Sequence, residues 1–322
     1  MIRRYIKSVV ALLIASASGL AVTAQVQAKE FRVGISSPES QNPFHVVMAR
    51  SIAETLKARG IEPMLMAANA DVNQQINSIG DMVAAKVDAI LVAPLNAEGP
   101  AAALVKAKDA GIPVFMYART LDPKYADVWE SFNGMDAVQV GRDKARWMAE
   151  NTKPGKVAML TGMAGAAPMI EQETGFREVI TAAGYQIAFS QTSNMTREYG
   201  IKLTEDALVT NPDLVGIYAA NDDLALGAAQ AVKVAGLQGK VVVIGLNGAP
   251  SALAAIHNGD LTATVLLDPV GWGKTAANVV ADYLLEGKKP AKFTPMDHKV
   301  VTQKEAYDNI PPPLREKLGV KR

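Results

Sequence analysis

Short apolar segments alternate with longer amphipathic segments throughout this chain. The short segments have the length and composition of buried strands, and the longer ones repeat their apolar residues at helical spacing. Regular alternation of this kind predicts an α/β fold with parallel sheets. The expected strands are Arg32–Ser36, Pro63–Ala67, Ala89–Ala93, Val114–Tyr117, Lys156–Thr161, Gln186–Gln191, Leu214–Ala219, Val241–Leu246 and Ala263–Leu267. The expected helices lie near Phe44–Arg59, Val72–Ala85, Ala97–Ala110, Val138–Asn151, Pro168–Ala183, Thr196–Thr210, Asp222–Ala235, Pro250–His257 and Gly271–Glu286.

Glycine and proline mark the ends of these helices. A glycine between a helix and the next strand favours the left-handed C′ conformation. A proline at a helix start lacks only an N–H that has no helical partner there. The glycines are Gly60, Gly111, Gly184 and Gly236, and the prolines are Pro43, Pro168 and Pro250.

The alternation breaks at Leu121–Met135, where no full helix separates two strand-like segments, the second being Val128–Phe132. Strand–helix alternation then restarts, which indicates two similar α/β halves with a hinge near Gly134. The late helix Gly271–Glu286 is followed by a further extended segment, His298–Thr302. A chain that crosses back to its first half and then returns explains both.

The amino terminus has the pattern of an export signal. Three basic residues precede an apolar or small stretch, Ser8–Ala24, and Val26-Gln27-Ala28 supplies the small residues of a cleavage site. Cleavage after Ala28 leaves 294 of the 322 residues, enough for two ordinary domains. The chain contains no cysteine, so it has neither a disulfide framework nor the attachment residue of a lipoprotein. We expect a free periplasmic protein.

Composition and motifs argue against several other classes. The net charge is +1 and no basic or acidic run occurs, so nucleic acid and anionic membranes are poor partners. The three histidines are scattered, no metal-ligand spacing is present, and nucleophile-elbow, phosphate-loop and dinucleotide fingerprints are absent. We expect no enzyme activity, no metal and no cofactor.

Polar side chains follow several expected strands, at the edge where parallel sheets bind ligands. Most are neutral amides and hydroxyls, which suit a sugar or sugar alcohol, whereas a phosphate would need several basic groups. They are Ser36, Ser37, Gln41, Asn42, Phe44, His45, Arg119, Glu171, Gln172, Met195 to Tyr199, Asn221, Asp222, Asn247 and Asp268.

Several of these residues also have an ordinary structural explanation. Asn42 and Asp222 stand where helix N-caps stand. Phe44 can staple its helix start, Arg119 can bridge two domains, and Trp272 at a helix start is most simply a packing residue.

Three motifs carry a resemblance to a known family. They are Asn42-Pro43-Phe44, the segment from Ala219 to Ala228, and the segment from Val242 to Gly248. With them, nearly the whole mature chain resembles the ribose-binding-protein family of periplasmic sugar-binding proteins for ABC importers. The resemblance implies a type I periplasmic binding protein, with two doubly wound parallel-sheet lobes joined by a three-crossover hinge near Gly134, Leu267 and Asp297. It implies an N-terminal lobe of residues 29–134 plus 268–297 and a C-terminal lobe of residues 135–267 plus 298–322.

The resemblance also implies ligand contacts. Asn42, Phe44, Arg119 and Asn221 match residues that hold sugar in the family. Other positions depart from its pattern: His45 replaces an aromatic ring, Ala118 an acid, Gln172 an arginine, Met195 an aromatic, Asn247 an acid, and Leu267, beside Asp268, a glutamine. These changes favour another pentose, a hexose or a flexible polyol over ribose. The predicted ligand-binding residues are Ser37, Asn42, Phe44, His45, Arg119, Gln172, Met195, Asn221, Asn247 and Asp268.

The function implied is capture of a neutral sugar or sugar alcohol between the lobes by a monomer and its delivery to ABC permease subunits. One alternative is a sugar or furanosyl-signal sensor that feeds a chemoreceptor or sensor kinase. A lactose-repressor-like regulator fits poorly, because the chain has a leader and no N-terminal helix-turn-helix. An exported α/β enzyme fits poorly because no catalytic motif was found.

Overall fold

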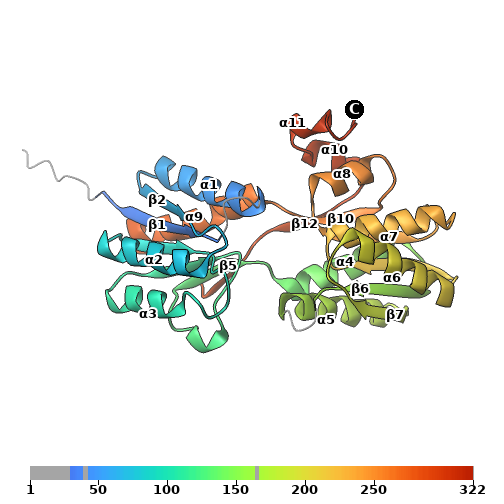
Figure 1. Ribbon diagram of the computed structural model, residues 1–322, viewed down its shortest axis with the longest axis horizontal. Helices are drawn as coiled ribbons and strands as arrows, with labels where there is room; N and C mark the ends of the chain where they lie inside the picture. Colours follow the sequence, from blue (N-terminus) through green and yellow to red (C-terminus); the bar gives the residue numbers. More distant parts are fainter. Residues whose placement is uncertain (1–29, 39–42, 164–166, 322) are drawn as a thin grey trace, which may run out of the picture. The chain divides into compact units, whose positions relative to one another are not determined.

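The protein contains two six-stranded sheets, each flanked by helices (Figure 1). The structure is a computed structural model that describes residues 30–38, 43–163 and 167–321. The first sheet has the strand order β11-β5-β4-β3-β1-β2, and all its strands are parallel. Its strands are β1 (Arg32–Ser37), β2 (Glu62–Ala67), β3 (Ala89–Val92), β4 (Val114–Tyr117), β5 (Ser131–Gly134) and β11 (Phe293–Pro295). Its helices are α1 (Pro43–Ala58), α2 (Val72–Ala84), α3 (Ala101–Asp109) and α9 (Pro269–Glu286), with a 3₁₀ turn η1 (Pro123–Tyr125).

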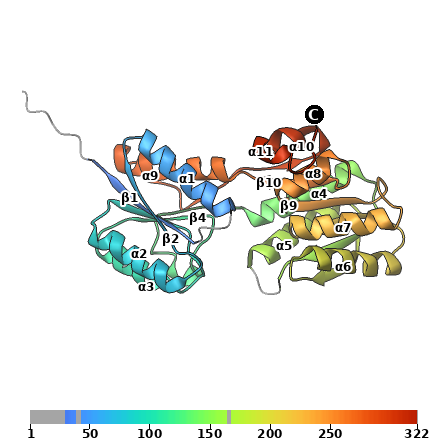
Figure 2. The same ribbon diagram turned by 45° about the horizontal axis from the view of Figure 1, so that its top comes forward.

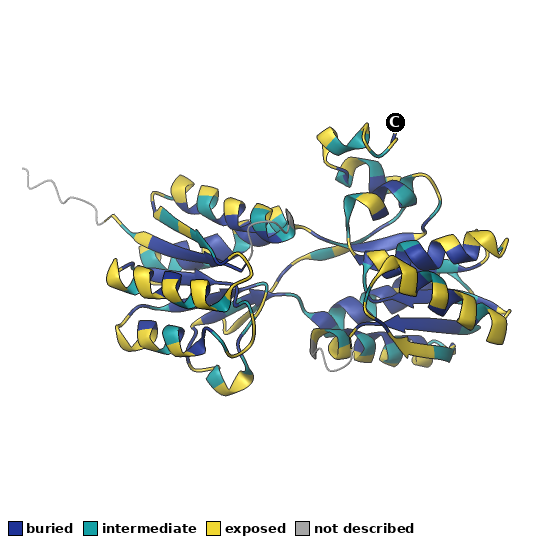
Figure 3. Cartoon of the chain, viewed as in Figure 1, coloured by how far each residue is buried: buried dark blue, intermediate teal, exposed yellow. Residues whose placement is uncertain are grey.

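Side chains on the first sheet alternate between two cores, because successive residues of a strand point to opposite faces. In β3, Leu91 packs in the core that contains α1 and α9, whereas Ile90 packs with α2 and α3. In β4, Phe115 and Met116 divide in the same way. Strands buried on both faces with helices on either side are the defining feature of a doubly wound sheet, and the buried strands stand out in Figure 3.

The second sheet has the strand order β12-β10-β9-β8-β6-β7, with β12 antiparallel to β10 and the other pairs parallel. Helix α4 packs against α5, and α6 packs against α7 (Figure 2). The strands are β6 (Lys156–Thr161), β7 (Gln186–Thr192), β8 (Leu214–Ala219), β9 (Val242–Asn247), β10 (Ala263–Leu267) and β12 (His298–Val301). The helices are α4 (Ala137–Asn151), α5 (Ala167–Ala182), α6 (Arg197–Thr210), α7 (Asp222–Val234), α8 (Pro250–His257), α10 (Gln303–Asn309) and α11 (Pro312–Arg315).

The chain passes between the two sheets three times. It leaves the first sheet after β5, returns after β10 to form α9 and β11, and then enters the second sheet as β12. The predicted fold class, two doubly wound α/β lobes with three crossovers, is therefore confirmed. None of the described helices combines the length and apolar character needed to cross a membrane.

Most expected helix ends are correct. Gly60, Gly111, Gly184 and Gly236 all have positive φ angles, between 72° and 84°, as C′ glycines do. One N-cap was wrong: Asn221 rather than Asp222 caps α7, because its side-chain oxygen accepts from Leu224 N at 2.9 Å.

Two strands differ from expectation. The strand expected at Val128–Phe132 begins only at Ser131, because Val128 and Trp129 pack their side chains into the core beside α2 and α3 from the preceding turn. Strand β11 was not anticipated. It has three residues and pairs with β5, from Phe293 opposite Phe132 to Pro295 opposite Gly134. A strand this short carries no periodicity that a sequence could reveal.

Candidate functional site

Each sheet has one point where the direction of winding reverses. In the first sheet it lies between β1 and β3, and in the second between β6 and β8. Adjacent connections leave on opposite faces there, and a crevice opens outside the carboxyl ends of the strands. The predicted ligand residues Ser37 and Asn221 lie at these two points, directly at the end of β1 and just after β8. Each lobe thus carries one half-site.

The half-site of the first lobe is built on polar groups at the end of β1. Gln75 of α2 donates to Ser36 Oγ at 3.1 Å and to Ala93 O at 3.0 Å. The Tyr117 hydroxyl at the end of β4 lies 3.3 Å from Ser36 O. Burial raises the pKa of Tyr117 above its ordinary value, although Ser37 and Arg119 oppose the shift, so this phenol stays neutral. Gln75 thus connects the end of β1 to the residue after β3 by hydrogen bonds. Its position inside a helix did not indicate this role in the sequence.

An aromatic group lies at the start of α1. The Phe44 ring stands edge-to-face with His45 at 5.4 Å and with Trp272 of α9 at 5.7 Å between centroids. Trp272 is buried and donates from Nε1 to Asp297 O at 2.7 Å, which confirms its packing role. His45 is also buried, whereas Phe44 is half-buried. Asn42, the neighbouring predicted contact, lies outside the described residues.

The half-site of the second lobe centres on Asn221. Its side-chain oxygen caps α7, and its amide nitrogen donates to Met195 O at 3.0 Å. One residue therefore links the end of β8 to the loop before α6. The structure brings Asn221 and Met195 together across β6, whereas the sequence indicated only that each follows a strand at the same edge of the sheet.

Three of the six described non-glycine residues with a positive φ lie at or beside the predicted site. Among the described non-glycine residues with positive φ are Ala118 (58°), Met195 (64°) and Asn247 (120°), which follow or end β4, β7 and β9. Such conformations cost on the order of 1–3 kcal/mol each and concentrate at ligand sites. Arg119 and Asn247 are exposed, as is Asp268, whose carboxylate caps α9 by accepting from Val270 N at 3.0 Å.

A buried polar cluster lies beside the second half-site. Gln172 of α5 is fully buried, and its side-chain oxygen accepts from Lys144 Nζ at 3.0 Å and from the Tyr218 hydroxyl at 2.8 Å. Burial lowers the pKa of Lys144 well below its ordinary value, and attraction to Asp222 offsets part of this shift. Burial also raises the pKa of Asp222 to about 7, against the effect of hydrogen bonds from Thr264 and Ala249.

Sequence reasoning missed Lys144, although a signal was present. Lys144 occupies the apolar face of α4, four residues after Val140 and three before Trp147, which are both buried. A lysine at an inward-facing position of a helix is rare unless its charge has a partner.

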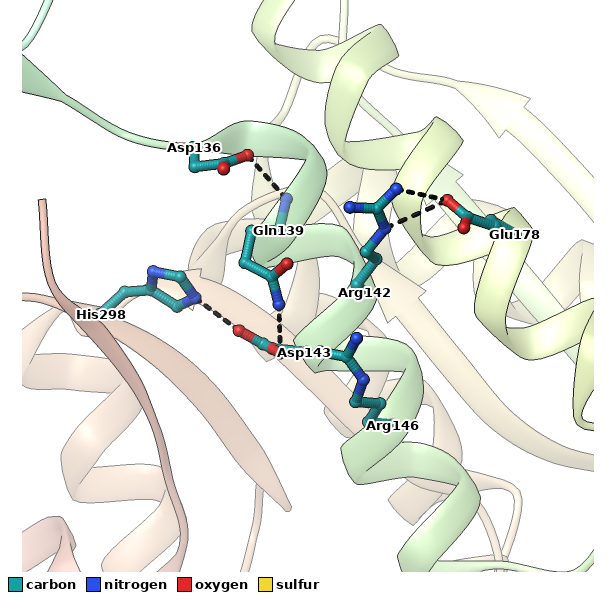
Figure 4. A network of polar contacts seen from close by, with 7 residues as sticks. All are labelled: Asp136, Gln139, Arg142, Asp143, Arg146, Glu178 and His298. Carbon is teal, nitrogen blue, oxygen red and sulfur yellow. Dashed lines mark hydrogen bonds and ion pairs between the residues drawn. The ribbon is translucent and has the colours of Figure 1, made fainter. Parts of the chain in front are cut away.

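A second polar network ties α4 to β12 (Figure 4). Asp136 caps α4 by accepting from Gln139 N at 2.9 Å, and the Gln139 amide donates to Asp143 at the same distance. His298 Nε2 lies 2.8 Å from the other Asp143 oxygen. Helix α4 follows the first crossover and β12 follows the third, so this network joins two of the three connecting segments where they enter the second lobe.

Comparison with known proteins agrees with this architecture. A model of the periplasmic binding protein domain matches residues 33–289. The ribose import binding protein RbsB of Bacillus subtilis is 32% identical over 86% of this chain and 88% of its own length. The galactofuranose-binding protein YtfQ of Escherichia coli is 31% identical over 97% of this chain and 98% of its own. A periplasmic ribose ABC transporter protein from Conexibacter woesei superposes with a TM-score of 0.82 at 28% identity, covering 88% of this chain and 98% of the other.

The family model and the relatives match most of the chain, and the solved structure superposes on both lobes, so the family can be assigned. The chain belongs to the periplasmic binding protein family, whose members bind solutes and are not enzymes.

Proposed function

We propose that this protein captures a neutral sugar or sugar alcohol in the periplasm and delivers it to an ABC importer. The observation that carries the proposal is the gathering of neutral polar side chains at the winding reversal of both sheets. Amides and hydroxyls can each pair with sugar hydroxyls, which donate and accept. Relatives named for ribose and galactofuranose binding support the same class of solute.

The proposed contacts form two sets. The first lobe contributes Ser37, Asn42, Phe44, His45 and Arg119, and the second contributes Gln172, Met195, Asn221 and Asn247, with Asp268 at the second crossover. Arg119 is the one cation among them. A phosphorylated solute would need more positive charge than one arginine supplies, so the proposal is restricted to uncharged solutes.

Binding is proposed to close a hinge. The ligand would contact both half-sites and shift the population towards a closed form, as in other hinged binding proteins. The hinge would separate residues 29–134 plus 268–297 from residues 135–267 plus 298–322. The Asp143–His298 contact would keep two crossover segments in register during this motion, because both belong to one lobe. We further propose cleavage after Ala28, a monomeric state and docking of the closed form on permease subunits, or on a chemoreceptor if the protein also signals.

A ligand screen tests the solute class. Protein unfolded and refolded to remove carried-over ligand should show a raised melting temperature with at least one neutral aldose or polyol, because a ligand that binds only the folded state stabilises it. The panel should include D-ribose, D-galactose and myo-inositol, with ribose 5-phosphate as the charged control. Stabilisation by the phosphorylated sugar alone would contradict the proposal. Loss of uptake in a deletion strain, with taxis retained, would separate transport from signalling.

Substitution of Arg119 and Asn221 tests whether these two residues contact the ligand. Arg119→Ala and Asn221→Ser should each weaken binding of the best sugar by at least ~1.5 kcal/mol, because a sugar hydroxyl that closure of the lobes would bury is left without its partner. Serine is chosen for Asn221 because it can still cap α7. Arg32→Ala is the matched control, since Arg32 stands at the opposite end of β1. Unchanged affinity by calorimetry in both variants would show that these residues are not contacts.

A further inference from the structure

Lys144 is fully buried in α4, yet its ammonium group is held by specific partners. Its Nζ donates to Ala219 O at 2.7 Å and to Gln172 Oε1 at 3.0 Å, and it lies 3.8 Å from the centroid of the Tyr218 ring. Burying a lysine costs folding free energy that a methionine of similar length would not. The arrangement therefore calls for an explanation other than stability.

The explanation lies in the orientation of the Gln172 amide. The amide atom that faces Lys144 is the oxygen, which accepts from Nζ at 3.0 Å, and Nζ also donates to Ala219 O. The Tyr218 hydroxyl donates to the same oxygen at 2.8 Å. Rotation of the amide by half a turn would place its N–H groups against both donors. Lys144 and Tyr218 thus fix Gln172 in one of its two orientations.

The amide nitrogen of Gln172 is left pointing away from these partners. It is buried and has no hydrogen-bond partner among the described residues. A buried donor without an acceptor is costly and uncommon in a folded protein. Its place in the fold is informative, because Lys144 ties Gln172 to Ala219, the last residue of β8 and two residues before Asn221. The donor therefore lies beside the winding reversal of the second sheet.

We propose that Lys144 is a positioning residue for ligand specificity, which holds Gln172 so that its amide N–H groups are presented to an acceptor oxygen of the bound solute. This inference rests on the proposed sugar-binding function. It adds that, in the contact with Gln172, the protein donates the hydrogen bond and the solute accepts it. The solute must place a hydroxyl or ring oxygen with a free lone pair at this point. A solute that lacks the oxygen leaves the donor unpaired and is rejected.

The experiment measures affinity for D-ribose, D-galactose and myo-inositol by calorimetry at pH 7. With the probe that binds best, Lys144→Met should weaken binding by about 10-fold or more, since the amide is then free to turn. Gln172→Leu should weaken binding at least as much. The double variant should bind no more weakly than Gln172→Leu alone, because Lys144 acts through Gln172.

Gln172→Glu tests the donor directly. A glutamate keeps the contact with Lys144 and Tyr218 but replaces the N–H groups by an oxygen, so binding should fall about as far as in Gln172→Leu. Binding as tight as wild type would overturn the inference, because the solute would then be donating at this point. Lys233→Met, which removes an exposed lysine of α7, is the matched control and should bind normally.

Thermal unfolding separates these effects from misfolding. Lys144→Met should still unfold cooperatively, at a lower temperature than wild type, because Ala219 O loses a donor and Asp222 loses an attracting group. If it fails to fold, Gln172→Leu and Gln172→Glu carry the test, and wild-type affinity in both variants overturns the inference. Wild-type affinity in Lys144→Met, or additive losses in the double variant, also overturn it while leaving the proposed function intact. Failure of wild-type protein to bind any of the three probes would contradict the proposed function and this inference together.

Discussion

Replacing Gly175 by alanine is expected to destabilise the protein by about 3 kcal/mol, at the upper end of the cost of overpacking. Helices α4 and α5 meet backbone to backbone: a Cβ on Gly175 would lie 2.0 Å from Val138 O, and one on Gly141 would lie 1.9 Å from Gln172 O. Carbon–oxygen contacts normally exceed ~3.3 Å, so the helices would have to separate. A carbonyl inside a helix cannot turn away as a side chain can.

Gly80→Ala provides the matched control. Gly80 lies in the middle of α2, is exposed, and a Cβ there would meet no atom within 4 Å. Alanine should therefore stabilise the protein by about 0.5–1 kcal/mol, since it lowers the entropy of the unfolded chain. Urea unfolding of both variants measures the two effects. A Gly175→Ala variant as stable as wild type would show that α4 and α5 are not in such close contact.

A second large effect is expected from pH acting on Asp222. Its buried carboxylate accepts from Thr264 Oγ1 at 2.5 Å and from Ala249 N at 2.6 Å, and burial raises its pKa to about 7. In the unfolded chain an aspartate titrates near ~3.9. Between these values the folded state holds a proton that the unfolded state has lost. The free energy of unfolding should therefore fall as pH rises from about 4 to about 7, by an amount on the order of 4 kcal/mol.

Asp222→Asn isolates this contribution. Asparagine can accept from Ala249 N and donate to Thr264, and it does not titrate. The variant should be more stable than wild type at pH 8 and close to it at pH 4, by urea unfolding at both values. The variant must be compared with wild type because Lys144 also makes the free energy of unfolding depend on pH, in the opposite direction. For Lys144 the unfolded state binds the extra proton, so stability rises with pH up to the ordinary lysine value. This contribution is present in both proteins and cancels in the difference.

Asp223→Asn is the control for Asp222→Asn, because Asp223 is exposed in the same first turn of α7. It should leave the pH dependence as it is in wild type. Equal pH profiles for Asp222→Asn and wild type would show that Asp222 is ionised in the folded protein throughout this range.

The local features of the fold were predictable from the sequence. Apolar segments of four to seven residues became strands, and glycines such as Gly60 and Gly184 adopted the left-handed conformation that ends a helix. These features depend on residues close in the chain, so a local pattern reveals them. Strand β11 was missed for the converse reason: its three residues become a strand only because β5 lies beside them.

For the candidate site too, the features that depend on local sequence were predictable and those that depend on tertiary contacts were not. Its edge could be predicted, because polar residues after parallel strands must gather at the carboxyl end of a sheet, as Ser37 and Asn221 do. The double role of Asn221 as helix cap and donor to Met195 could not, since it depends on how two loops meet.

The sequence by itself determined that this chain forms two similar α/β halves and where along it polar residues follow the strands; the doubly wound arrangement of each half was implied by the family resemblance. The halves and the polar positions could be recognised because helix and strand periodicity, helix ends and strand ends depend on residues that are close together in the chain. Only the tertiary structure decided that Lys144, Gln172 and Tyr218 form one buried cluster beside Asn221. Those three residues come from α4, α5 and β8, and their contact depends on helices packed closely enough to bring a lysine and a glutamine together.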